Sequence, residues 1–103
     1  MKSSFYDRCL ALRNFYIKRE TDSTKLILLS KLVALSFYNQ EKVIDDLPKG
    51  KTLEIDCSDL TACAPKVEDS LSEVLSDLEF SNFDVGHNKN YNLFHKVNFM
   101  IKE

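Results

Sequence analysis

Two histidines, His87 and His95, are the side chains best suited to acid–base chemistry near neutral pH. Both have odd residue numbers, as do the apolar residues of the strands predicted around them, so they belong to the apolar face of those strands. A hairpin with a five-residue loop over 89–93 would place the two imidazoles directly opposite each other, whereas a three-residue loop would offset them by two positions. Two facing imidazoles can act as acid and base in RNA cleavage, or as half of a zinc site.

The residues around the histidines complete neither site. A zinc ion needs a third and a fourth ligand, which only a distant Cys or Asp could supply. An RNA-cleaving pair needs a cationic clamp for the phosphate, but residues 52–103 carry a net charge of −6. We therefore interpret both histidines as strand-end residues beside a turn, partly covered by helix side chains. We expect neither a metal nor a cofactor.

The three cysteines, Cys9, Cys57 and Cys63, cannot all pair, and they lack the CxxC spacing of zinc and thiol-redox sites. Cys9 and Cys57 lie on predicted apolar faces, where a free cysteine behaves as a small hydrophobic residue. Cys63 lies near a predicted helix start, a position that can activate a thiol, but no histidine can be assigned to it. Two glycines in the whole chain exclude a glycine-rich phosphate loop. The sequence predicts that the protein is not an enzyme.

Charge is distributed unevenly along this chain of 103 residues, whose net charge is −2. Residues 1–51 hold ten Lys or Arg and six Asp or Glu, whereas residues 52–103 hold four and ten. An acidic protein is a poor general ligand for DNA or RNA, because the phosphate backbone repels it. We predict that nucleic acid is not a direct partner.

The third predicted helix carries acidic residues where stability alone would favour basic ones. Asp69, Glu73 and Asp77 repeat at intervals of four residues, as a column of like charges on the solvent side. Other acidic residues lie near a predicted helix C-terminus, where the helix dipole repels anions. The residues that we assign to a partner-binding surface are Asp45, Asp46, Asp69, Glu73, Asp77 and Glu79. A solvated face that only keeps the protein soluble is the alternative interpretation of the same charges.

Apolar spacing predicts three helices and three strands in the order α-α-β-α-β-β. Helical spacing covers residues 5–19 and 24–46, and a third helix ends near Leu78, with Thr61 as its N-cap and Pro65 in its first turn. Alternation marks strands at 53–57, 83–85 and 93–101. The last strand is the longest, so we place it in the middle of a three-stranded antiparallel sheet with helices on its apolar face. This is a single two-layer α+β domain over residues 1–103.

The second predicted helix is apolar around much of its girth, which is typical of a central packing element. Val33 and Phe37 lie on the stripe that continues from Leu26 to Ile44, so we expect both to be fully buried. Truncation of Phe37 to Ala would then cost about 3–5 kcal/mol. The aromatic residues of the first two helices fit a helix–helix core better than a base-stacking platform; they are Phe5, Phe15, Tyr16, Phe37 and Tyr38.

No segment predicts a membrane or secretory location. The chain begins with charged residues before any apolar stretch, unlike a signal peptide. The most apolar window, residues 26–38, is interrupted by Ser30 and Lys31 and is too short to cross a bilayer. We expect a cytoplasmic protein with no membrane partner.

Compact size, an acidic surface and no catalytic constellation form the general profile of immunity proteins, antitoxins and phage-encoded inhibitors. We predict a small non-catalytic inhibitor that occludes a basic site on a protein partner, such as a nuclease toxin. A structural or regulatory subunit that oligomerises through its apolar N-terminal helices is the alternative, and the oligomeric state stays open.

Overall fold

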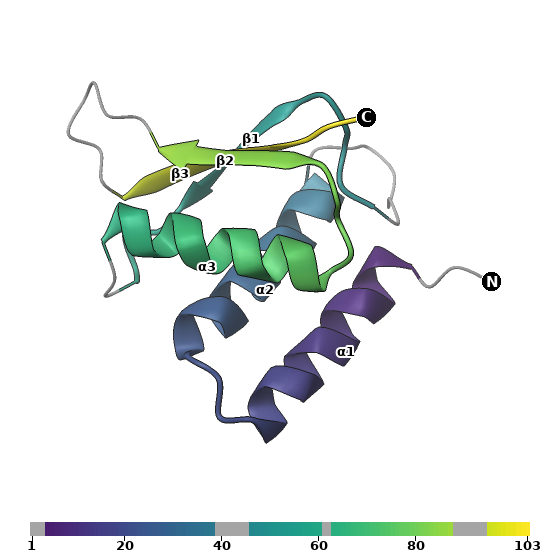
Figure 1. The fold of residues 1–103 in the computed structure, drawn as a ribbon, viewed down its shortest axis with the longest axis vertical. Coiled ribbons are helices and arrows are strands. Elements are labelled where there is room, and N and C mark those ends of the chain that lie inside the picture. Colours follow the sequence, from purple (N-terminus) through teal and green to yellow (C-terminus); the bar gives the residue numbers. More distant parts are fainter. Residues whose placement is uncertain (1–3, 39–45, 61–62, 88–94) are drawn as a thin grey trace. The chain divides into compact units, whose positions relative to one another are not determined.

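A computed structural model describes residues 4–38, 46–60, 63–87 and 95–103, and Figure 1 shows the fold. The described elements are α1 (Phe5–Lys18), α2 (Ser23–Tyr38), β1 (Thr52–Asp56), α3 (Ala64–Asp77), β2 (Phe83–His87) and β3 (Lys96–Ile101). The α+β class and the predicted order of elements are confirmed. The chain divides into two compact units, residues 1–48 and residues 49–103. The single domain over residues 1–103 stays a prediction.

Helix α1 begins where the sequence predicts, because Ser4 caps it. The Ser4 hydroxyl accepts a hydrogen bond from the Asp7 backbone N–H at 3.1 Å, which satisfies one of the free donors at the helix N-terminus. One stripe of the helix, at spacings of four and seven residues, is buried. Its buried residues are Phe5, Cys9 and Tyr16.

Helix α2 begins at a second side-chain cap, in which the Asp22 carboxylate accepts from the Thr24 N–H at 2.9 Å. It packs against α1 within the first unit. Its buried residues beyond the first turn are Leu28, Leu29, Leu32 and Ser36. The predicted continuation over 39–45 lies outside the described residues, and Asp46 is not helical.

The predicted burial of Val33 and Phe37 is wrong. Val33 is only half-buried, and the Phe37 residue is 39% exposed. The buried side of α2 follows Leu28, Leu32 and Ser36 instead, which is a different stripe of the same helix. Because α2 is apolar on several sides, hydrophobic periodicity does not distinguish the side that is buried.

The second unit contains an antiparallel sheet in the order β1-β3-β2, so the last strand occupies the middle as predicted. Leu53 of β1 and Val85 of β2 both lie opposite Phe99, which places these three side chains on one face. The buried strand residues on this face are Leu53, Ile55, Val97, Phe99 and Ile101. The other face is polar, and ion pairs join Lys96 to Glu54 (3.3 Å) and Lys102 to Asp84 (2.9 Å).

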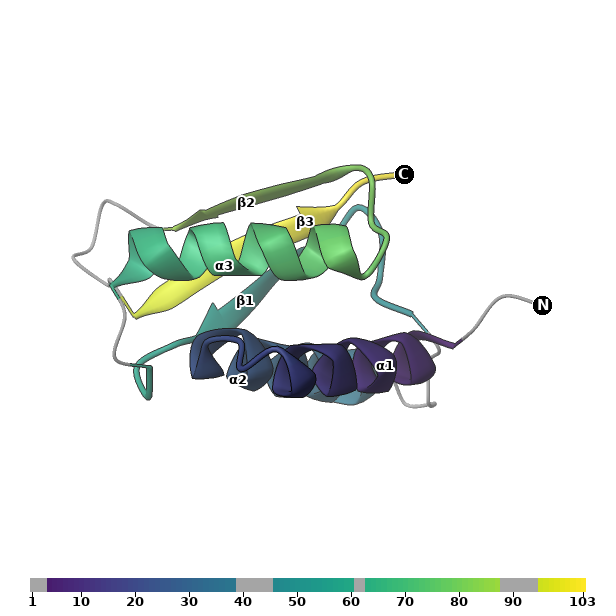
Figure 2. The same ribbon diagram turned by 60° about the horizontal axis from the view of Figure 1, so that its bottom comes forward.

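Helix α3 lies along the sheet (Figure 2) and packs on β2 and β3. Its buried residues, which recur at helical spacing, are Ala64, Val67, Leu71, Val74 and Leu75. Pro65 lies in the first turn as predicted, but the N-cap is Cys63 and not Thr61. The cap differs because Cys63 is the residue with extended backbone before the first helical turn, although its side chain makes no capping hydrogen bond.

None of the helices described is long and apolar enough to cross a membrane.

Two helices end with a glutamate in the left-handed conformation, a position that normally favours glycine. Glu79 follows α3 with a φ of 72°, and Glu20 follows α1 with a φ of 52°. The Phe80 N–H donates to the Leu75 carbonyl at 3.1 Å, and the Glu79 N–H donates to the Ser76 carbonyl at 3.0 Å. These two bonds form a Schellman motif, which satisfies carbonyls at the end of α3. Its closure imposes backbone strain on Glu79.

The strain at Glu79 predicts that Glu79→Gly stabilises the protein, by about 1 kcal/mol, because glycine adopts a positive φ without a Cβ penalty. Urea unfolding of Glu79→Gly and Glu79→Ala measures this. Alanine removes the same charge but keeps the strained Cβ, so Glu79→Ala should be stabilised less than Glu79→Gly. Equal stability of the two variants would show that the backbone is not strained.

Candidate functional site

Four of the acidic residues that the sequence assigned to partner binding are exposed, three on α3 and one just beyond its C-terminus. Asp69, Glu73 and Asp77 are all exposed, and so is Glu79 just beyond the helix. The apolar side of the helix packs on β2 and β3, so the opposite side presents the carboxylates. We call Asp69, Glu73, Asp77 and Glu79 the acidic face. Their predicted exposure is confirmed, and their role in binding stays a prediction.

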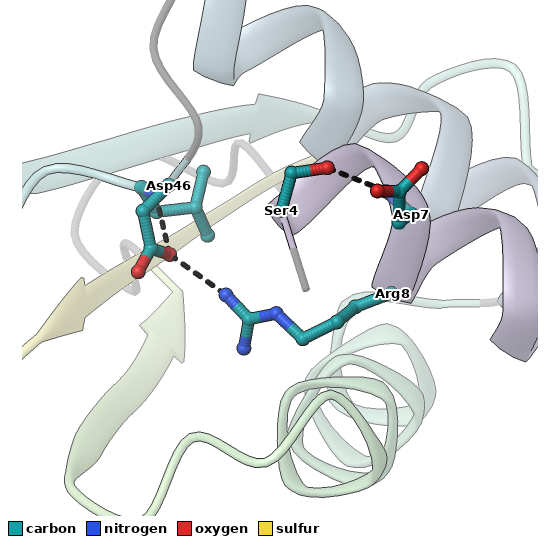
Figure 3. A network of polar contacts seen from close by, with 5 residues as sticks. Ser4, Asp7, Arg8 and Asp46 are labelled. Carbon is teal, nitrogen blue, oxygen red and sulfur yellow. Dashed lines mark hydrogen bonds and ion pairs between the residues drawn. The ribbon is translucent and has the colours of Figure 1, made fainter. Parts of the chain in front are cut away.

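Asp46 lies in the other unit and has a partner there. Its carboxylate accepts a hydrogen bond from the Arg8 guanidinium of α1, at 3.3 Å, and another from the Leu47 N–H at 2.9 Å (Figure 3). The expected placement of Asp46 at a helix end is wrong, because its backbone is not helical. Its role in partner binding stays a prediction. Asp45 lies outside the described residues.

The two histidines do not face each other. His87 lies opposite Val97 in the β2–β3 ladder, so His95 is offset from it by two positions. This is the second of the two hairpin registers that the sequence allowed. The backbone of His95 contacts the residue just after β1, because its carbonyl accepts hydrogen bonds from the N–H and the thiol of Cys57. His87 and His95 are therefore not direct cross-strand partners.

His87 contacts a carboxylate that the sequence analysis did not assign to it. Its Nδ1 lies in hydrogen-bond contact with Oε1 of Glu68, in the second turn of α3. The side chains are 9% and 24% exposed. The pair joins α3 to the end of β2, and it matches the expected cover of His87 by a helix side chain. No signal in the sequence identifies Glu68, because the two residues meet only when the helix packs on the sheet.

The cysteines have three different environments. Cys9 and Cys57 are buried, as predicted, and Cys63 is exposed. Burial raises the pKa of the Cys9 thiol from 9.0 to about 12, while the positive charge of Arg8 acts in the opposite direction. A thiol with a raised pKa is a poor nucleophile. Within the residues that the structure describes, no three His, Cys, Asp or Glu side chains gather as metal ligands.

Large apolar side chains are exposed on α1 and α2, in contrast to the predicted helix–helix core. Sequence reasoning placed Phe15 and Phe37 in that core, and both are exposed. The full set of exposed large apolar residues in the described chain is Tyr6, Leu10, Phe15, Ile17 and Phe37. A sequence signal for part of this set exists. Residues 6, 10, 13 and 17 form a second stripe on α1, directly beside the buried stripe that starts at Phe5.

An open groove of about 260 Å³ lies between α1 and α2. Helix α1 contributes Tyr6, Cys9, Leu10 and Arg13 to its lining, and helix α2 contributes Leu29 and Val33 among others. We call this feature the α1–α2 groove. Its lining is largely apolar and contains a single charged side chain.

Comparisons with known proteins give no further information on these features. No protein-family model, no curated protein and no solved structure matches this chain.

The His87–Glu68 contact predicts a measurable coupling between the two side chains. We expect His87→Gln and Glu68→Gln to lower the free energy of unfolding modestly, with a coupling energy of about 1 kcal/mol in a double-mutant cycle. Chemical denaturation of the four proteins measures it. His95→Gln is the matched control, because the hydrogen bonds of His95 with Cys57 use its backbone carbonyl. A zero coupling energy, or a zinc-dependent rise in Tm lost in either His variant, would contradict a structural role.

The raised pKa of Cys9 predicts a loss of stability at alkaline pH. The unfolded chain releases the thiol proton above pH 9.0, whereas the folded chain retains it up to about 12. The folded state is therefore disfavoured progressively between these values, by at most about 1.4 kcal/mol per pH unit. Urea unfolding at several pH values from 8 upward compares the wild type with Cys9→Ala. The wild type should lose stability more steeply, and parallel pH profiles would refute the assignment.

Proposed function

We propose that the protein is a non-catalytic inhibitor that binds a basic protein partner through the acidic face of α3. The observation that supports this proposal is the exposure of four carboxylates along one side of the helix and just beyond its C-terminus. A cleft lined by Lys and Arg, such as the nucleic-acid site of a nuclease, has the complementary charge. Inhibition then consists of occupying that cleft.

The placement of the carboxylates is unfavourable for stability alone. Asp69, Glu73 and Asp77 repel one another along the helix, at a few tenths of a kcal/mol per pair in an isolated helix. Asp77 and Glu79 also oppose the helix dipole. Glu79 in addition has a positive φ. A surface that retains such residues fits selection for binding, since functional sites often reduce stability.

Docking through this face depends on electrostatic attraction before contact. The negative charge of the acidic face attracts a basic cleft at long range and raises the association rate. Dissolved salt screens the attraction beyond about 8–10 Å at physiological ionic strength. Binding through the acidic face should therefore weaken as the salt concentration rises.

The alternative function, a subunit that oligomerises through its N-terminal helices, has a separate supporting observation. Large apolar residues are exposed on α1 and α2, where burial against a second surface would be favourable. Oligomerisation of this kind should be largely insensitive to salt, because apolar burial dominates it. We rank it second because both helices are basic. Two copies would bring like charges together.

Charge reversal of the acidic face tests the proposed function. Asp77→Lys with Glu79→Lys should stabilise the isolated protein by up to about 1 kcal/mol, because Lys complements the helix dipole. The same change should abolish retention of the basic partner at low ionic strength. The measurements are the melting temperature, and the amount of each protein that the tagged chain retains from its native host, by quantitative mass spectrometry.

A matched variant separates the surface from the net charge. Glu20→Lys with Glu103→Lys makes the same change in net charge, and Glu20 occupies the same left-handed position after α1 that Glu79 occupies after α3. This control should retain the partner. If the acidic-face variant retains it as well, the carboxylates only keep the protein soluble.

A further inference from the structure

The shape of the α1–α2 groove fits a helix better than a small molecule. Its volume of about 260 Å³ lies below the range of roughly 300–1,000 Å³ that is common for small-molecule sites. The lining residues of α1 run from Tyr6 to Arg13, which is two helical turns or about 10 Å. Buried Cys9 and Leu29 contribute apolar lining, whereas Tyr6 and Leu10 are 52% and 42% exposed.

On each of the two helices, an exposed apolar residue lies one helical turn beyond the residues that line the groove. Ile17 follows Arg13 by four residues on α1, and Phe37 follows Val33 by four residues on α2. Residues four apart lie on the same side of a helix. An occupant of three to four helical turns would therefore meet apolar side chains along its length. Helix-in-groove recognition uses anchors at i, i+3 or i+4, and i+7, which matches this spacing.

The charge of the two helices indicates the sign of the charge that the bound partner should carry. Helices α1 and α2 contain five Lys or Arg and one acidic residue, Asp7. Arg8 is paired with Asp46. Arg13 is exposed, lines the groove and makes no ion pair within the described part of the chain. A carboxylate on the occupant would provide Arg13 with a charge-assisted hydrogen bond.

We propose that the α1–α2 groove binds an acidic amphipathic helix of another protein. The apolar side of that helix occupies the groove, and an Asp or Glu at its edge pairs with Arg13. This inference goes beyond the proposed function, because it concerns another surface with the opposite charge. Its test is independent of the acidic face.

A second copy of the chain and a membrane surface fit the groove less well. The α1 and α2 of a second copy would present the same excess of Lys and Arg, and like charges across an interface are unfavourable. The exposed side of α3 has acidic residues but no exposed large apolar residue to place in the groove. An anionic bilayer matches the charge, but a flat lipid surface contacts protruding side chains and leaves a concave lining uncovered.

A displayed library of helical peptides of about 14 residues, selected against the intact protein, tests the proposal. The selected peptides should combine apolar residues at i, i+3 or i+4, and i+7 with an excess of Asp and Glu. Leu10→Lys and Arg13→Glu should each lower the affinity for a selected peptide about tenfold or more. Both residues are exposed, so the fold should persist, which circular dichroism and the melting temperature verify.

Two comparisons give the test its specificity. Phe15→Lys is the matched control, because Phe15 is an exposed apolar residue of the same helix that does not line the groove. It should leave the affinity unchanged. A peptide in which Lys replaces the acidic residues should bind Arg13→Glu more tightly than it binds the wild type, which a merely structural role of Arg13 would not produce.

Several results would overturn the proposal. Selected peptides without an acidic excess would exclude an acidic helix as the occupant. Equal losses of affinity for Leu10→Lys and Phe15→Lys would exclude this groove as the site. A dimer in light scattering that Leu10→Lys dissociates would assign the groove to a second copy. Binding to vesicles of phosphatidylserine and phosphatidylcholine that depends on Leu10 and Phe15 alike would assign the surface to a membrane.

Discussion

The second unit depends on the burial of one side of its central strand. Val97, Phe99 and Ile101 alternate along β3 and are buried, and β3 pairs with a strand on each of its edges. Helix α3 packs on this sheet through its own apolar stripe. The orientation of α3 about its axis is thereby determined, and with it the exposure of the opposite side. The alternation of buried residues along β3 and the helical spacing of apolar residues along α3 together determine where the carboxylates on α3 lie.

Elements with one clean period could be predicted from the sequence. The alternation through Leu53 and Ile55 identified β1, and the helical spacing from Val67 to Leu78 identified α3, because in each case only one face is apolar. The central position of β3 also followed from its length and regularity. The exposure of Asp69, Glu73 and Asp77 could be predicted for the same reason, since these residues occupy the side of α3 opposite its apolar stripe.

Features that depend on contacts between distant residues could not be predicted. Helix α2 has apolar residues on several sides, so its sequence does not show that Phe37 is exposed. Asp46 pairs with Arg8, 38 residues earlier in the chain, and no local pattern indicates such a pair. The offset of the histidines depends on the register of β2 against β3, and the sequence allowed two registers that differ by two residues. The groove could not be predicted because it forms only where Tyr6 and Leu10 of α1 lie beside residues of α2.

The central position of β3 leaves β1 and β2 as the two outer strands of the sheet. An outer strand has backbone groups with which a strand of another molecule can pair, and this pairing is a common first step in fibril growth. Both outer strands here are only five residues long and contain acidic residues, Glu54 and Asp56 on one and Asp84 on the other. A second molecule that approached edge to edge would meet a short strand with charged side chains, which are features that disfavour such pairing.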